Sequence, residues 1–139
     1  MDMGGVGGTL AGNALSVAAT RATLEHVLTD EAFDHMDRLS ARFETGVRSA
    51  VEAHGLPWSV SRLGARTEYR FAAPAPRTGT ASEAAADPDL EDFLHLYLAN
   101  RGILLTPFHN MALMCPDTTE RDVDTHTAVF GAALLELAG

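Results

Sequence analysis

Apolar residues recur at helical spacing along much of this chain. The longest stripe lies between positions 29 and 53, where its members follow one another at steps of three or four: Phe33, Met36, Leu39, Phe43, Val47 and Val51. Thr29 has the features of a helix cap, and Gly55 and Pro57 have those of a helix stop. The pattern predicts one amphipathic helix over residues 29–53 with a single buried face.

Three further segments are predicted to be helical. Residues 13–28 follow the potential cap Asn13 and are apolar around most of the helix, so this helix needs partners on several sides. Asp87, followed by a proline, is a strong helix start. A final helix begins after Thr118 or Thr119, with acidic residues in its first turn, where the helix dipole favours them.

Strand-like segments lie between these helices. Residues 58–63 and 67–72 read as two strands of a hairpin, and residues 103–106 and 111–114 are two shorter candidates. Residues 73–87 are rich in proline, alanine, serine and threonine, which predicts a flexible loop. The order helix, helix, hairpin, loop, helix, two strands, helix predicts an α+β fold: a small, mostly antiparallel sheet with helices on one face.

Composition narrows the class of protein. The chain has 139 residues and is 46% hydrophobic, which is typical of one globular domain. Its net charge of −9 argues against binding to nucleic acid or anionic membranes. Its start lacks the features of a signal peptide, and no apolar run approaches the roughly 18 residues of a membrane helix, so a cytoplasmic protein is expected. Scattered histidines and the single Cys115 predict no metal site.

The basic residues exclude two kinds of chemistry. All ten are arginine, and the chain contains no lysine. It therefore cannot form a Schiff base through a lysine amine, and it cannot supply the lysine of a P-loop.

A glycine-rich segment precedes the first predicted helix. It reads GGTLAGN over residues 7–13. Backbone amides at a helix start, together with the hydroxyl of Thr9, could hold a phosphate. The alternative is a flexible N-terminal tail.

Three segments together carry a family resemblance. Residues 8–19 read GTLAGNALSVAA and resemble the GTLSGNPLAMAA segment of class III pyridoxal-phosphate-dependent aminotransferases, most closely the glutamate-1-semialdehyde aminomutase branch. Residues 101–107, RGILLTP, resemble the family's RGVxLxP, and residues 118–124, TTERDVD, resemble its HTEEDID helix start. The resemblance covers essentially the whole chain.

The resemblance implies that this chain is a C-terminal fragment of a fold type I enzyme. Residues 1–28 would be the end of the large cofactor domain, and residues 29–139 the small C-terminal domain. The family's Schiff-base lysine and the aspartate that pairs with the pyridine nitrogen lie upstream of the matched region. No catalytic residue is therefore expected in this chain, which alone should be inactive.

The same resemblance implies a cofactor contact at the N-terminal segment. Thr9 would hydrogen-bond the phosphate of pyridoxal 5′-phosphate across the interface of a homodimer, and Gly8 would give the phosphate access to the backbone. Ala14 departs from the family, which often has proline there. This departure softens the helix start and leaves Thr9 unaffected.

Two residues are candidates for contact with a small amino or keto substrate. Arg66, near the hairpin turn, could bind a substrate carboxylate through its guanidinium fork. His109 follows a segment that in the family approaches the substrate entrance. The alternatives are a solvated hairpin arginine and an ordinary loop histidine. For the whole chain, the alternative is a free-standing α+β binding or interaction module derived from such a domain.

Overall fold

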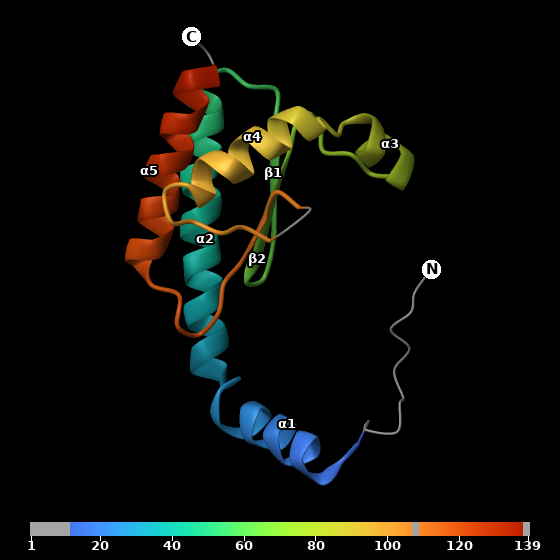
Figure 1. Ribbon diagram of the computed structural model, residues 1–139, viewed down its shortest axis with the longest axis vertical. Helices are drawn as coiled ribbons and strands as arrows, with labels where there is room; N and C mark the ends of the chain where they lie inside the picture. Colours follow the sequence, from blue (N-terminus) through green and yellow to red (C-terminus); the bar gives the residue numbers. More distant parts are fainter. Residues whose placement is uncertain (1–11, 107–108, 138–139) are drawn as a thin grey trace.

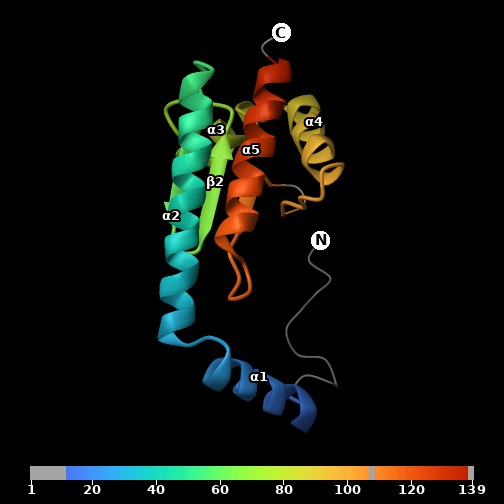
Figure 2. The same ribbon diagram turned by 90° about the vertical axis from the view of Figure 1, so that its left-hand side faces the viewer.

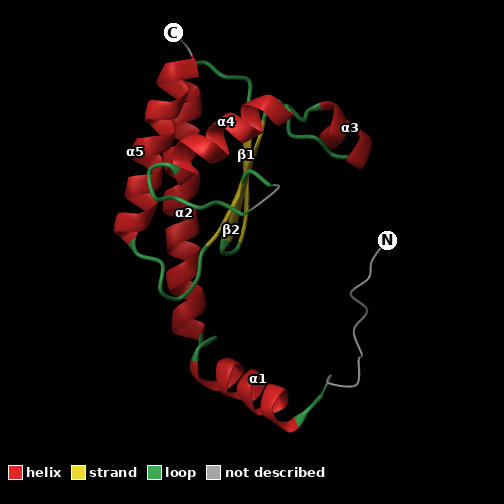
Figure 3. Ribbon diagram, in the orientation of Figure 1, coloured by secondary structure: helices red, strands yellow, loops and turns green. Residues whose placement is uncertain are grey.

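The computed structural model describes residues 12–106 and 109–137, which form five helices and three strands. Figure 1 labels most of these elements along the chain, and Figure 3 separates the helices from the strands. In chain order they are α1 (Ala14–His26), α2 (Asp30–Ala53), β1 (Ser59–Leu63), β2 (Arg66–Arg70), α3 (Gly79–Ala84), α4 (Pro88–Ala99), β3 (Met111–Leu113) and α5 (Glu120–Leu137).

The strands form one antiparallel sheet in the order β1-β2-β3. The register pairs Val60 with Tyr69 and Thr67 with Ala112, so these four residues share one face of the sheet. Helix α2 packs on β1 and β2, and α5 runs alongside α2 (Figures 1 and 2). A small antiparallel sheet with helices on one face is thus observed, and the predicted α+β fold is confirmed.

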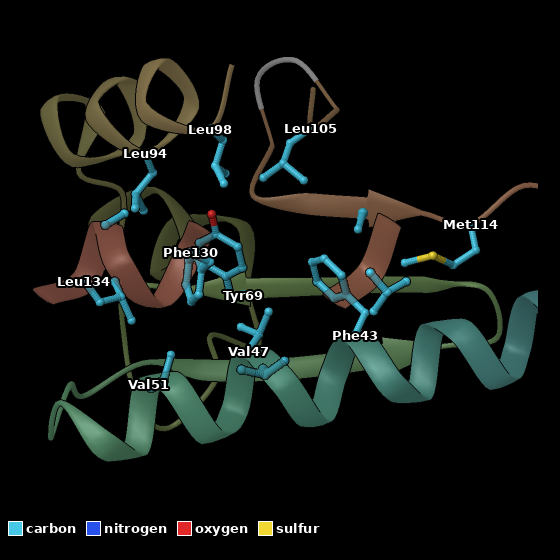
Figure 4. Close-up of a cluster of buried hydrophobic side chains, with 14 of the residues drawn as sticks. Phe43, Val47, Val51, Tyr69, Leu94, Leu98, Leu105, Met114, Phe130 and Leu134 are labelled. Carbon is cyan, nitrogen blue, oxygen red and sulfur yellow. The ribbon is translucent and has the colours of Figure 1, made fainter. Parts of the chain in front are cut away.

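Tyr69 lies at the centre of the core. Its ring centroid is 5.2 Å from that of Phe130 and 6.0 Å from that of Trp58. Side chains from α2, α4 and α5 surround it and are fully buried, including Val47, Leu94, Leu98 and Leu134 (Figure 4). Five of the six predicted stripe residues of α2 are buried, whereas Phe33 is 52% exposed because the first turns of α2 project beyond the sheet (Figure 1).

The helix starts follow from the sequence as predicted. Asn13, Thr29 and Asp87 each accept a hydrogen bond from the backbone amide three residues ahead, at the starts of α1, α2 and α4. At α5, the Thr119 hydroxyl accepts from the Asp122 amide, and the Asp122 carboxylate accepts from the Thr119 amide. This reciprocal pair is a capping box with aspartate in the acidic position.

Two local predictions differ from the structure. Residues 103–106 were expected to form a strand, but they are irregular, and the Thr106 amide donates to the Met111 carbonyl at 3.3 Å. Leu105 is nevertheless buried, which explains why the segment is apolar. Residues 73–87 were predicted to be a loop, but they contain the short helix α3, which Thr78 caps. The helix was not predicted because its residues are mostly small and polar.

Helix α1 lies apart from the core. It has no buried residue, and its apolar side chains face outward, with Leu15 80% exposed. Figures 1 and 2 both show it projecting from the end of α2. The several partners that its apolar circumference requires are therefore not supplied by the described residues.

The two long helices approach closely at Gly46. A Cβ atom at this position would lie against the side chain of Thr127 on α5. Thr127 is β-branched, and its own Cβ would be only 3.1 Å away, so even after a rotamer change the helices would have to shift by a few tenths of an ångström. Arg42 also joins these helices, because its Nε and Nη2 donate to the Asp124 carboxylate at 2.7 and 2.9 Å.

Gly46→Ala is therefore expected to lower the free energy of unfolding. Overpacking of this kind costs about 1–3 kcal/mol, partly offset by the gain of about 1 kcal/mol in helix propensity. Chemical denaturation monitored by circular dichroism measures the change.

A matched control is Gly131→Ala on α5, because an added Cβ there meets nothing within 4 Å. This substitution should stabilise the protein by about 0.5–1 kcal/mol. Equal effects of the two substitutions would show that the helices do not approach closely at Gly46.

Candidate functional site

The predicted cofactor contacts, Gly8 and Thr9, lie outside the described residues. The described chain begins just after them, with Gly12 at a φ of 73° and Asn13 capping α1. The side chain of Asn13 accepts from the Ser16 amide at 3.0 Å and donates to the Ser16 hydroxyl at 2.9 Å. The first turn of α1 is thus capped by the chain itself, and a phosphate contact would depend on the residues before Gly12.

The sheet presents a second face, opposite to α2 and α5, which we call the open face. Side chains alternate along each strand, so residues two positions apart point to the same side. The register aligns Ser61 with Glu68 and Met111, and Leu63 with Arg66 and Leu113. The open face therefore consists of Ser59, Ser61, Leu63, Arg66, Glu68, Arg70, Met111 and Leu113.

Arg66 lies on the open face and is paired with a carboxylate. Its Nη2 donates to Oε2 of Glu68 at 2.6 Å, and Nη2 of Arg70 faces Oε1 of the same carboxylate at 2.7 Å. The Glu68 side chain is only 10% exposed, whereas both arginines are more open to solvent. Two guanidinium groups on one carboxylate leave a net charge of +1, and Arg66 keeps further N–H donors that an anion could use.

Arg66 and His109 are not brought together. The Tyr69 amide donates to the Asn110 carbonyl at 3.0 Å, which continues the register of β2 and β3. His109 therefore lies near the level of Arg70, about 13 Å along the strand from Arg66. His109 is exposed, and its backbone amide donates to the Thr106 carbonyl at 3.3 Å.

Sequence reasoning missed His126, a buried histidine. It lies on α5 between the rings of Phe43 and Phe130, at centroid distances of 4.3 and 5.6 Å, and neither ring nitrogen has a hydrogen-bond partner among the described residues. Burial lowers the pKa of His126 to about 4, because the interior disfavours its charged form. The sequence feature that could have identified it as buried is its position in the apolar stripe of α5, between Val123 and Phe130.

The described residues offer no metal centre. Residues 12–106 and 109–137 contain no group of three or more histidine, cysteine, aspartate or glutamate side chains placed to share an ion. Over the same residues, no helix is both long and apolar enough to cross a membrane.

Comparison with known proteins reveals a clear similarity. A glutamate-1-semialdehyde aminomutase from Pseudomonas aeruginosa PAO1, solved in complex with PMP, is 52% identical over 99% of this chain and 30% of its own, with a TM-score of 0.92. A glutamate-1-semialdehyde 2,1-aminomutase from Desulforapulum autotrophicum is 33% identical over 135 residues, which are 95% of this chain and 30% of its own. An omega-transaminase from Sphaerobacter thermophilus, 23% identical over 96% of this chain and 30% of its own, shares the fold with a TM-score of 0.78.

These relatives are longer proteins. The chain spans about 30% of their length and matches the C-terminal part of their chains. The structures that it matches include complexes with PMP and with PLP. No model of a known protein family matches the chain.

His126 makes stability depend on pH. An unfolded histidine has a pKa near 6.5 and the buried one a pKa of about 4, so the unfolded state binds the proton more readily between these values. The contribution of His126 to the free energy of unfolding should be fully present above pH 6.5. It should decrease by about 3 kcal/mol as the pH falls to 4. Urea denaturation at pH 7 and pH 4 measures this decrease.

In His126→Leu, most of the decrease should disappear. His109→Gln is the matched control, because that histidine is exposed and should leave the pH dependence of the wild type unchanged. The same pH dependence in His126→Leu and in the wild type would contradict the assignment.

Proposed function

Because this chain matches the C-terminal part of glutamate-1-semialdehyde 2,1-aminomutases, we propose that it serves as the C-terminal portion of a class III pyridoxal-phosphate-dependent aminotransferase or aminomutase. The observation that carries the proposal is the 52% identity across 99% of the chain, at a TM-score of 0.92. Amino-group transfer or migration on a small amino or keto substrate, in the cytoplasm, is the activity that we assign to the complete enzyme.

In this proposal, the chain divides between two domains of that enzyme. Residues 1–28 form the end of the cofactor domain, and residues 29–139 form the small C-terminal domain. The different burial of α1 and α2 supports this division. Helix α1 has no buried residue, whereas α2 contributes six to the shared core.

The cofactor fits this chain only as a non-covalent ligand. When bound, pyridoxal phosphate supplies the electron sink for chemistry at the amino-bearing carbon. The chain has no lysine to attach it, so that amine comes from the rest of the enzyme, and this chain alone is inactive. Its own contribution is a phosphate contact across a dimer interface, in which Thr9 donates its hydroxyl and Gly8 leaves the backbone accessible. The exposed N-terminal turn of α1, directly after this segment, leaves room for a second body to approach.

Arg66 and His109 are proposed to meet the substrate from the small domain. Arg66 suits a carboxylate, because its bond to Glu68 uses one donor on Nη2 and the guanidinium has further N–H donors. His109 is exposed two residues before β3, near the level of Arg70. Because the two residues are not adjacent, they would contact different parts of a ligand.

The alternative function is that of a free-standing interaction module. The observation in its favour is that α2, α4, α5 and the sheet share one well-packed core without help from α1. The DNA upstream of the coding sequence distinguishes the two functions. An in-frame cofactor domain with a lysine supports the enzyme, and a promoter and stop codon support the module.

The cofactor contact is tested in a fusion protein in which this chain replaces the matched C-terminal part of the Pseudomonas aeruginosa relative. In this fusion, Thr9→Val should weaken retention of pyridoxal phosphate by roughly 1–3 kcal/mol, the value of a hydrogen bond to a charged group. Equilibrium dialysis of the cofactor measures the dissociation constant.

Thr20→Val is the matched control, because the Thr20 hydroxyl bonds only within α1, to the Ser16 carbonyl at 2.8 Å. It should leave cofactor retention unchanged. An unchanged dissociation constant in Thr9→Val would place the phosphate elsewhere.

A further inference from the structure

A pocket opens beneath the segment where a strand was expected and is not formed. Residues 103–106 are irregular, and among the described residues no backbone hydrogen bond joins residues 103–105 to β3. Within this segment Leu105 is 7% exposed, whereas Leu104 is 84% exposed. The segment therefore lies over the edge of the core without closing it. A pocket of about 190 Å³ remains between this segment, β3, α2 and the first turns of α5.

The walls of this pocket are mostly apolar. Phe43 comes from α2, Leu105 from the irregular segment, Met114 from the end of β3 and Val123 from α5. Figure 4 shows Phe43 and Met114 at the end of the core that lies away from Leu134. An apolar cavity of about 150 Å³ is large enough for one benzene ring. The pocket therefore has the size and the lining for a molecule with a single ring.

His126 brings an unpartnered polar group to this pocket. It is 3% exposed, and neither Nδ1 nor Nε2 has a hydrogen-bond partner among the described residues. The rings of Phe43 and Phe130 pack against the imidazole, so its edge, which carries the nitrogens, is the part that remains for the pocket. Buried polar atoms are nearly always hydrogen-bonded, and ligand pockets combine apolar walls with a few polar groups. An unpartnered imidazole in an apolar wall thus indicates a ligand that completes its hydrogen bonding.

The charge and the partners of the polar groups define the class of ligand. Asp122 accepts from the amide and the hydroxyl of Thr119, at 2.8 and 2.7 Å, and the Thr118 hydroxyl donates to Sγ of Cys115 at 3.3 Å. His126 is neutral at pH 7, because burial lowers its pKa to about 4, so its ring has one N–H donor and one acceptor nitrogen. A ligand hydroxyl can bond to either nitrogen. A carboxylate or phosphate would instead lie beside Asp122 in an apolar pocket, which is unfavourable.

We propose that this pocket binds a small neutral molecule of the phenol class, with its hydroxyl bonded to His126. The ring of the ligand packs against Phe43, Leu105 and Met114. Because the imidazole nitrogens are buried, binding requires a shift of Met114, which its flexible, unbranched side chain permits. The site lies on the side of the sheet that α2 and α5 cover. It is independent of the proposed function, which uses none of these residues.

Titration of phenol into the isotope-labelled 139-residue chain at pH 7, followed by NMR, tests the site. The signals of the His126 ring nitrogens and of the amides of Leu105, Met114 and Val123 should shift together and saturate. The expected dissociation constant is about 1 mM, as for a ligand of few atoms. Benzene, which lacks the hydroxyl, should bind about fivefold more weakly, because it cannot form the hydrogen bond to His126.

Two variants distinguish the pocket from general apolar binding. In His126→Leu, phenol and benzene should bind with equal affinity, because the hydrogen-bonding nitrogens are absent. Leu24→Ser is the matched control, since it removes an exposed apolar side chain from α1 and should leave the affinity for phenol unchanged. If His126→Leu does not fold, the comparison of phenol with benzene in the wild type decides the matter.

Three results would overturn the proposal. The absence of saturable shifts would show that the pocket takes up water at most. Equal affinities of phenol and benzene for the wild type would show that His126 does not bond to the hydroxyl. Shifts confined to α1, together with loss of binding in Leu24→Ser, would place phenol on that exposed helix instead.

Discussion

The alternation of side chains along β2 divides this molecule into two surfaces. Thr67 and Tyr69 point toward α2 and α5, where Thr67 forms a fully buried hydrogen bond with Ser40 at 2.8 Å and Tyr69 packs on Phe130. Arg66, Glu68 and Arg70 point the other way as a consequence, because neighbouring residues of a strand cannot share a face. A shift of the register by one residue would bury the ion cluster and expose the tyrosine. The core and the open face therefore depend on one pattern of five residues.

That pattern also connects the fold to the proposed enzyme. The face that carries Tyr69 is covered by the helices of this chain, and its core is closed. On the face that carries Arg66, Leu63 and Leu113 are exposed, and α1 has no buried residue. Relatives that match this chain in their C-terminal part are more than three times as long, and the proposed function places the rest of such an enzyme before this chain.

Much of the fold could be predicted because its signals are local. The stripe of α2, the caps at Asn13, Thr29 and Asp87, and the hairpin each depend on residues close together in sequence. The strand predicted at residues 103–106 was wrong, because an irregular segment that buries Leu105 is as apolar in sequence as a strand. His126 was overlooked because a histidine inside an apolar stripe is recognised as buried only when its neighbours in space, Phe43 and Phe130, are known. For Arg66, the guanidinium was identified, but its partner two residues along the same strand was not considered. Gly8 and Thr9 came from the family resemblance and lie outside the described residues, so they stay predictions.

The central claim is that this chain completes a pyridoxal-phosphate enzyme and does no chemistry alone. Amino transfer from an amino donor, measured as conversion of the bound cofactor from its pyridoxal to its pyridoxamine form, tests it most directly. The fusion with the Pseudomonas cofactor domain is predicted to carry out the conversion, and the 139-residue chain mixed with pyridoxal phosphate is predicted to show none. Conversion by the isolated chain, or a folded fusion that retains the cofactor but never converts it, would contradict the claim.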